Sequence, residues 1–198
     1  MAEFPLAEAV KGKDVAIEWM PFELRPEPHP TLRPEGDYLQ RAWQQSVYPL
    51  ARRMGVEIRL PPVSPQPHTH LAWEGFQFAR EHAKGNEYND RVLRAFFVEG
   101  RDIGSPGVLA ELAGEVGLDA AAFRDALDRR RYRDAHRTAL QRAHDLGITG
   151  VPAFEIGGRL LVGVQPREAL EAAITEADPR GSGEGLVCGP DGCEVRPS

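Results

Sequence analysis

Two cysteines near the C-terminus are the side chains of this chain with the highest intrinsic reactivity. Cys188 and Cys193 are its only cysteines, and the sequence Gly-Pro-Asp-Gly lies between them. Such a sequence favours a tight turn, and a turn can bring two Cα atoms within the roughly 4.4–6.8 Å that a disulfide requires. We therefore take Cys188 and Cys193 as the candidate catalytic residues, because the pair can cycle between dithiol and disulfide. Half of a zinc site, a structural clip in the tail and an incidental exposed pair are the alternatives.

The residues before this pair place it on a tail. After Asp178-Pro179 the chain continues as Arg-Gly-Ser-Gly-Glu-Gly, a composition typical of a flexible linker. A linker of this kind leaves the thiols accessible, which thiol–disulfide exchange requires. We expect residues 178–198 to form a flexible tail that carries Cys-x4-Cys.

A proline that opens a short apolar segment is the second feature that points to function. Residues 153–156 and 159–162 are largely apolar and are separated by Gly157-Gly158, which predicts a β-hairpin with a two-residue turn. Pro152 cannot donate a hydrogen bond to a central strand ladder. Its position before the hairpin therefore favours a cis Val151–Pro152 bond in a tight turn.

The segment 147–166 resembles the cis-proline loop and final hairpin of DsbA-like thiol–disulfide oxidoreductases. It is most similar to the FrnE-type branch, which is related to 2-hydroxychromene-2-carboxylate isomerases. Residues 15–24 look like the second strand of that branch and the turn after it, residues 37–146 like its inserted helical domain, and residues 165–170 like its closing helix. The resemblance reaches to about residue 177. It implies an α/β fold, thioredoxin-like with an inserted all-helical domain.

The resemblance also implies where a substrate binds. In this family the cis bond turns the backbone before the proline outward. The N–H and C=O of Val151 can then pair with an extended substrate chain, as an added strand would. Thr149, Gly150, Val151 and Pro152 are therefore the candidate substrate-binding residues. An ordinary trans proline without this role is the alternative.

The beginning of the chain departs from the family pattern. Members begin with a strand that ends in Cys-x-x-Cys, or in a serine in glutathione-using relatives. Residues 1–10 instead read like the tail of the helix that follows this strand. The resemblance places the strand between those expected at 15–20 and 153–156, so its absence would leave two apolar edges unpaired. We therefore expect the natural protein to carry this strand and its motif upstream of Met1; a degenerate homologue is the alternative.

The order of the expected elements divides the chain into three parts. Residues 1–36 and 147–177 are expected to form a discontinuous thioredoxin-like domain, in which 13–24 and 150–177 belong together. Residues 37–146 are expected to form the inserted helical domain, and 178–198 the tail. Caps, stops and apolar spacing predict helices over 37–54 with a kink at Pro49, over 68–84, 86–100 and 106–116, one capped by Asp119, one ending at Leu146, and one beginning at Pro166.

The remaining histidines and a cluster of arginines are given structural roles. His68 and His70 stand two residues apart at an expected helix start, where they do not face each other. His136 and His144 are expected at the surface or at its boundary. The arginines at 129, 130, 131 and 133 alternate with acidic residues, which predicts a solvated helix face.

Composition and charge exclude several classes of function. Hydrophobic residues make up 41% and charged residues 27% of the chain, as in a soluble globular protein, and the net charge of −6 gives no electrostatic footprint for nucleic acid. No apolar run approaches the roughly 20 residues of a membrane span, and the start shows no recognisable signal peptide. We expect a cytoplasmic protein that binds no cofactor, metal, nucleic acid or membrane. The sequence leaves its oligomeric state open.

Three functions are compatible with these residues. The first is a cytoplasmic thiol–disulfide oxidoreductase or disulfide isomerase, with Cys188 and Cys193 as a second redox centre and with disulfide-containing proteins or small thiols as partners. The second is a glutathione-dependent isomerase of the 2-hydroxychromene-2-carboxylate type, which has no need of the tail pair. The third is a non-catalytic homologue that binds peptides beside Pro152.

Overall fold

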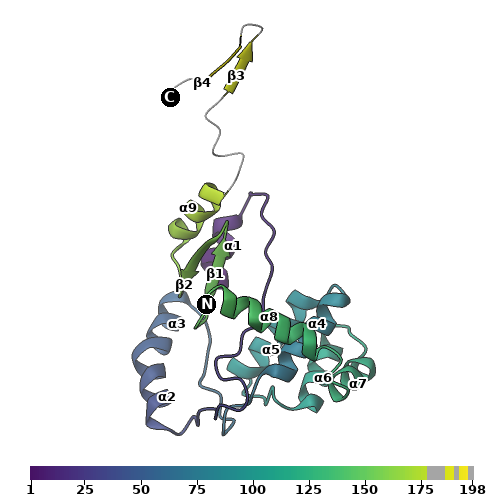
Figure 1. Cartoon of the computed structure of the whole chain (residues 1–198). Coiled ribbons are helices and arrows are strands. Elements are labelled where there is room, and N and C mark those ends of the chain that lie inside the picture. The colour runs from purple at the N-terminus through teal and green to yellow at the C-terminus, as the bar shows by residue number, and fades with distance from the viewer. Residues whose placement is uncertain (178–185, 190–191, 196–198) are drawn as a thin grey trace. The chain divides into compact units, whose positions relative to one another are not determined.

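The computed structural model describes residues 1–177, 186–189 and 192–195, and in the last two segments it describes only the backbone. Its helices are α1 (Glu3–Val10), α2 (Asp37–Ala42), the π-helical turn η1 (Trp43–Val47), α3 (Tyr48–Met54), α4 (His70–Glu81), α5 (Gly85–Phe97), α6 (Pro106–Glu115), α7 (Ala120–Asp128), α8 (Arg133–Asp145) and α9 (Arg167–Ala177) (Figure 1). Its strands are β1 (Ala153–Ile156), β2 (Arg159–Val162), β3 (Leu186–Gly189) and β4 (Gly192–Val195). Contacts divide the chain into two compact units, residues 17–149 and residues 1–16 together with those from 150 onward.

The unit formed by residues 1–16 and those from 150 onward, here called the hairpin unit, is built on β1 and β2. The two strands pair antiparallel from Ala153 opposite Val162 to Ile156 opposite Arg159. Gly157 and Gly158 form the turn with φ of 57° and 84°. Two successive positive φ angles suit glycine and match the right-handed twist of the strands, so the predicted hairpin is confirmed.

Two helices complete the core of the hairpin unit. Helix α1 packs against α9, and α9 also contacts β1. The residues that these helices bury are small or aliphatic, which allows a close approach: Leu6, Ala9, Leu170 and Ala173. Residues 3–10 are thus helical and 167–177 form the helix predicted after Pro166.

The unit formed by residues 17–149, here called the helical unit, has the larger apolar core. The core lies between α4, α5, α6 and α7 (Figure 1), and its largest fully buried apolar side chains include Tyr88, Leu109, Leu112, Phe123 and Leu127. Phe123 and Leu127 lie four residues apart on the buried face of α7, as their spacing predicts. The side chain of Asp119 accepts hydrogen bonds from the N–H groups of Ala121 and Ala122 at 2.9 and 3.0 Å, which confirms the predicted N-cap.

The helix predicted over 37–54 forms with an irregular middle. Its α-helical pattern is interrupted by the π-helical turn over Trp43–Val47, just before Pro49. Proline has no N–H to donate and clashes with the preceding turn, so the regular pattern cannot pass through this position. Gly55 ends the helix with a φ of 64°. Trp43 packs edge-on against Tyr48 and at a tilt against Phe97 of α5, which holds this helix on the core.

Residues 15–20 do not form the strand that their alternation predicts. No ladder in the described part of the chain includes them, and β1 pairs with β2 alone there. Residues 17–36 belong to the helical unit, and the unit boundaries lie at 16/17 and 149/150 rather than at 36/37 and 146/147. Trp19 packs on the helical core and Trp73 Nε1 donates to the carbonyl of Phe22 at 3.0 Å. These contacts draw the segment to the helices rather than to residues 150–177, where we expected it.

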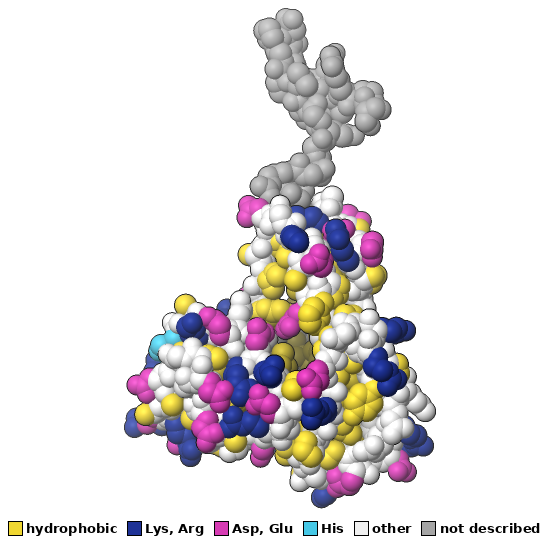
Figure 2. Space-filling view, turned by 180° about the vertical axis from the view of Figure 1, so that it is seen from behind, with side chains coloured by type: hydrophobic (Ala, Val, Ile, Leu, Met, Phe, Trp, Pro, Cys, Tyr) yellow, Lys and Arg dark blue, Asp and Glu magenta, His cyan; other side chains and the backbone are white. Residues whose placement is uncertain are grey.

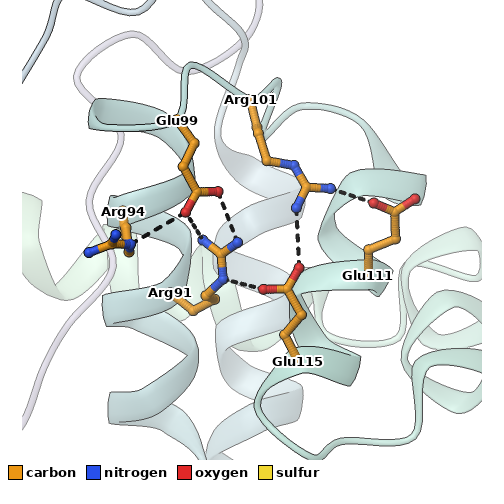
Figure 3. A network of polar contacts seen from close by, with 6 residues as sticks. All are labelled: Arg91, Arg94, Glu99, Arg101, Glu111 and Glu115. Atoms are coloured by element: carbon orange, nitrogen blue, oxygen red, sulfur yellow. Dashed lines mark hydrogen bonds and ion pairs between the residues drawn. The ribbon is translucent and has the colours of Figure 1, made fainter.

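A network of ion pairs joins α5, the turn after it and α6 (Figure 3). Arg91 pairs with Glu99 at 2.9 Å and with Glu115, and Arg101 pairs with Glu111 and, at 3.3 Å, with Glu115. Arg94 adds a contact to Glu99. The hydrogen bond from Arg91 lowers the pKa of Glu115. A network of alternating charges on three neighbouring elements stabilises more than isolated surface pairs do.

The surface shows no broad region of one charge in the view of Figure 2. Basic and acidic side chains lie next to one another across that face. Among the described residues, no helix is both long and apolar enough to cross a membrane.

Candidate functional site

The loop that enters β1 carries the substrate-binding residues predicted from the sequence. The Val151–Pro152 bond is cis, as predicted. The carbonyl of Pro152 accepts a hydrogen bond from the N–H of Gly163 at 2.8 Å, directly beyond the end of β2. This bond closes the open end of the hairpin, so the hairpin fixes the position of Pro152.

Val151 is an accessible residue of this loop. Half of its surface, 51%, is exposed although the side chain is apolar. Thr149 is exposed too, and a Cβ placed on Gly150 would meet no atom within 4 Å. Among the hydrogen bonds of the described residues, none uses the N–H or C=O of Val151. An exposed apolar side chain beside free backbone groups is suited to binding an extended chain.

The edge of β1 away from β2 has no partner strand among the described residues. It begins directly after Pro152, so the free backbone groups of Val151 and of this edge follow one another along the chain. A free strand edge can accept another strand, and the family resemblance places the first strand of the fold at this edge.

The two cysteines lie on a second hairpin. Strands β3 and β4 pair antiparallel, with the Cα of Cys188 directly opposite that of Cys193. Directly opposite residues in such a pair have Cα atoms about 4.5–5.5 Å apart, a spacing that a disulfide can bridge. The side chains of both cysteines lie outside the described residues, as does the predicted linker over 178–185.

Two contacts of buried carboxylates in the helical unit were missed by the sequence analysis. His136 Nε2 lies 2.7 Å from Glu23 Oε1, and the two side chains are only 3% and 4% exposed. Arg130 holds the buried carboxylate of Glu74 through three hydrogen bonds of 2.7–3.0 Å. The expectation that His136 lies at the surface or at its boundary is therefore wrong, whereas the four clustered arginines lie exposed as expected.

A signal for His136 was present in the sequence. His136 shares the buried stripe of α8 with Ala139 and Ala143, at the spacing of one helix face. Glu23 is flanked by Phe22 and Leu24 in an otherwise apolar run. A titratable residue within each pattern indicates a buried polar group, but neither pattern names its partner, which lies 113 positions away.

Burial and nearby charges shift the pKa values of three residues around these contacts. Burial lowers the pKa of His70, and the charge of Arg130 lowers it further. The hydrogen bonds to Glu74 raise the pKa of Arg130. Burial and the hydrogen bond to Glu81 raise the pKa of Tyr132 to about 12. The rings of His68, just before α4, and His70, its first residue, lie tilted with centroids 6.4 Å apart. His68 Nδ1 lies 3.1 Å from the carbonyl of Arg25.

Comparison with known proteins identifies the family of this chain. A model of the DSBA-like thioredoxin domain matches residues 1–175. An uncharacterized protein of Bacillus subtilis, YwbO, is 52% identical over 171 residues, which are 85% of this chain and 86% of that protein.

Two solved structures share the fold. A probable DsbA oxidoreductase of Streptomyces coelicolor superposes with a TM-score of 0.74 at 24% identity, over 99% of this chain and 93% of that one. The cytosolic disulfide reductase DsbM of Pseudomonas aeruginosa, solved with GSH, gives a TM-score of 0.58 at 22% identity, over 86% of this chain and 89% of that one. The chain therefore has an α/β thioredoxin-like fold with an inserted helical part, as the sequence predicted.

Proposed function

The chain belongs to the family of DSBA-like thioredoxin domains, and from this premise we propose that it is a thiol–disulfide oxidoreductase or disulfide isomerase. Its substrates are disulfides of proteins or of small molecules. The observation that carries the proposal is the exposed Val151, whose backbone N–H and C=O have no hydrogen-bond partner among the described residues. A protein disulfide lies within a peptide segment, and the backbone groups of Val151 can pair with such a segment when it is extended.

Thr149, Gly150, Val151 and Pro152 form the substrate-binding loop in this proposal. The N–H and C=O of Val151 pair with the substrate backbone, and the exposed side chain of Val151 contacts an apolar substrate side chain. Backbone pairing does not depend on side-chain identity, so it allows many peptides to bind. The loop therefore selects extended segments rather than one sequence.

Cys188 and Cys193 act as a redox centre in the same proposal. The thiolate of one cysteine attacks a substrate disulfide, forms a mixed disulfide and releases one substrate thiolate. The other cysteine then attacks the mixed disulfide, which releases the second substrate thiol and leaves a Cys188–Cys193 disulfide. Two electrons pass from the tail to the substrate. The direct opposition of the two cysteines in the register of β3 and β4 supports this step.

Two molecules of a small thiol complete the cycle: the first forms a mixed disulfide with the tail, and the second releases it as a small-molecule disulfide and restores the dithiol. We propose glutathione or a similar thiol for this role and the cytoplasm for its location. Support comes from the DsbM structure, which is described as a cytosolic disulfide reductase with GSH. A reducing compartment keeps the tail as a dithiol, the form that can donate electrons.

Insulin reduction by the full chain in the presence of dithiothreitol tests this function. We compare the wild type with Cys188→Ser, Cys193→Ser and the double variant, and expect weak activity in the wild type that each substitution abolishes. Serine is close to cysteine in size but has no thiolate, so each variant tests the thiol without a change in packing.

Two other results would point to other functions. Equal insulin reduction by wild type and double variant would remove the tail from the redox chemistry, and one bound zinc per two chains would support a shared metal site instead. Isomerisation of a 2-hydroxychromene-2-carboxylate that requires glutathione, without disulfide reduction, would support the isomerase alternative.

A further inference from the structure

A hollow at the surface of the helical unit lies between helix α4 and the start of helix α8. The two helices lie side by side (Figure 1), and the hollow has a volume of about 340 Å³. This is within the roughly 300–1,000 Å³ of small-molecule sites. Residues of α4 three and four positions apart form one wall of the hollow, and residues at the start of α8 form the other. The lining residues are Gln77, Arg80, Glu81, Tyr132 and Ala135.

Two side chains of opposite charge flank this hollow, and a neighbour holds each of them in place. Arg80 Nη2 donates to Glu18 at 2.9 Å, and the guanidinium carbon of Arg80 lies 5.9 Å from the ring centre of Phe76. The hydroxyl of Tyr132 donates to Glu81 Oε2. Burial raises the pKa of Tyr132 to about 12, so this hydroxyl remains a donor at neutral pH. Groups that are held in advance lose little conformational freedom when a ligand binds.

The hollow keeps hydrogen-bonding capacity that the described residues do not use. Gln77 is half-buried, and its side-chain amide has no partner among them. Their hydrogen bonds also leave Arg80 Nη1 and Glu81 Oε1 unused. A ligand therefore meets donors from Arg80 and Gln77 and an acceptor from Glu81. The methyl group of Ala135 and the ring of Tyr132 add apolar surface beside these groups.

The charges around the hollow balance one another. Arg80 pairs with Glu18, and Glu81 lies 3.8 Å from Arg131. A simple anion or cation would meet one favourable and one unfavourable charge here. A small molecule that carries both charges on neighbouring atoms finds a partner for each of them.

We propose that this hollow binds a free α-amino acid with an apolar side chain. The carboxylate of the ligand accepts hydrogen bonds from Arg80 and from the amide of Gln77. Its ammonium group donates to Glu81 Oε1. Its side chain lies against Ala135 and the ring of Tyr132. The hollow belongs to the helical unit and contains no thiol, so this binding does not depend on the proposed thiol–disulfide activity.

The binding is weak because water reaches both charged groups. The side chains of Arg80 and Glu81 are 39% and 55% exposed. Exposed ion pairs contribute little to binding. We therefore expect a dissociation constant of about 1 mM, which suits a site that responds to the concentration of an abundant metabolite.

NMR titration of the full chain, labelled with ¹⁵N, with L-leucine tests this site. The amide signals of Gln77, Glu81 and Ala135 should shift and saturate with one dissociation constant of about 1 mM. N-acetyl-L-leucine lacks the ammonium group, and L-leucinamide lacks the carboxylate. Each analogue should bind at least about tenfold more weakly than L-leucine, because one of the two charged contacts is missing.

Two variants separate recognition of the ammonium group from a general effect of charge. Glu81→Gln keeps the shape of the side chain and removes its charge, so this variant should no longer distinguish L-leucine from N-acetyl-L-leucine. Glu87→Gln removes an exposed carboxylate of α5 that does not line the hollow, and it should bind L-leucine as the wild type does. If Glu81→Gln does not fold, the wild-type series of three ligands decides.

Either of two wild-type results overturns the proposal. One is the absence of a saturating shift at these three amides up to about 20 mM L-leucine. The other is equal binding of L-leucine and its two analogues, because a site for a free amino acid must recognise both of its charges.

Discussion

The hydroxyl of Tyr88 is fully buried and has no hydrogen-bond partner among the described residues. Burial raises the pKa of Tyr88, because the phenolate is not solvated there. The Tyr88 hydroxyl lies against Gly75, where a Cβ would come within 2.5 Å of it. An unpaired buried polar atom is unfavourable by about 1–3 kcal/mol. At the scale of single residues, the buried hydroxyl of Tyr88 therefore lowers the stability of the helical unit.

We predict that Tyr88→Phe leaves the free energy of unfolding unchanged or raises it by about 1 kcal/mol, because the unpaired hydroxyl is removed while the ring stays. Urea unfolding followed by circular dichroism measures the change. Tyr132→Phe is the matched control, since the hydroxyl of Tyr132 donates to Glu81 and its loss should lower stability. A loss of stability in Tyr88→Phe larger than that in Tyr132→Phe would show that Tyr88 has a partner.

We predict that Val151→Ser weakens disulfide reduction with little effect on stability. An exposed valine contributes little to the folded state, but contact with a substrate would bury its apolar surface. Losing such a contact should lower kcat/KM for an extended peptide disulfide about threefold to tenfold. Leu24→Ser, at an exposed apolar site in the helical unit, should leave this value unchanged. Equal values for all three proteins would argue against substrate binding at the loop.

At the scale of elements, the positions of helix ends and of the β1–β2 turn follow from nearby residues. Asp119, Gly55 and Gly157-Gly158 act on groups within a few positions of themselves, so the sequence alone could place them. Residues 15–20 alternate as a strand does, but a strand forms only against a partner edge. Trp19 instead packs on helices, and this contact with distant residues could not be read from the alternation.

The turn of the β1–β2 hairpin offers a sharp comparison between two neighbouring glycines. Both have positive φ, so alanine is strained by about 1 kcal/mol at either position. A Cβ on Gly157 would also come within 2.5 Å of the Cβ of Ala177, whereas one on Gly158 would meet nothing within 4 Å.

We therefore predict that Gly157→Ala lowers the free energy of unfolding by about 2–3 kcal/mol and Gly158→Ala by about 1 kcal/mol. Thermal unfolding of both variants shows which substitution lowers stability more. Equal losses would mean that the end of α9 moves away from the turn without resistance.

At the scale of the whole molecule, stability depends on carboxylates that are paired with arginine. The pKa of Glu115 is lowered from its usual 4.5 by the hydrogen bond from Arg91. A lowered pKa in the folded state means that the pair stabilises the fold fully above the unfolded pKa. This stabilisation is lost as the pH falls through the lowered value.

We predict that the Tm falls between about pH 6 and pH 3, as the paired carboxylates become protonated. Glu115→Gln should have a lower Tm than the wild type at pH 7 and a smaller fall on acidification, because one of the titrating pairs is absent. Calorimetry at low and high salt checks the assignment, since salt screens these partly exposed pairs. A fall of the same size in Glu115→Gln would exclude this network as a source of the acid sensitivity.

The candidate site shows which parts of a function can be predicted from a sequence. Pro152, its hairpin and the opposed cysteines are close in sequence to the residues that position them, and all could be placed in advance. The contact of Glu23 with His136 joins residues 113 positions apart. Each residue carried a local sign of burial, but only the folded chain brings the segment that carries Glu23 against α8.

The chain leaves the hairpin unit after Ala16 and returns at Gly150, so everything between these residues belongs to the helical unit. Helices α1 and α9 can therefore meet only after the chain has closed a loop that contains the helical unit. Closing this loop has an entropic cost that must be met before contacts across it form, whereas the helical unit is built mainly from contacts between neighbouring helices. Low contact order favours early folding. During synthesis the ribosome would also release α4–α7 before β1, so α1 would remain without its partner until the helical unit is complete.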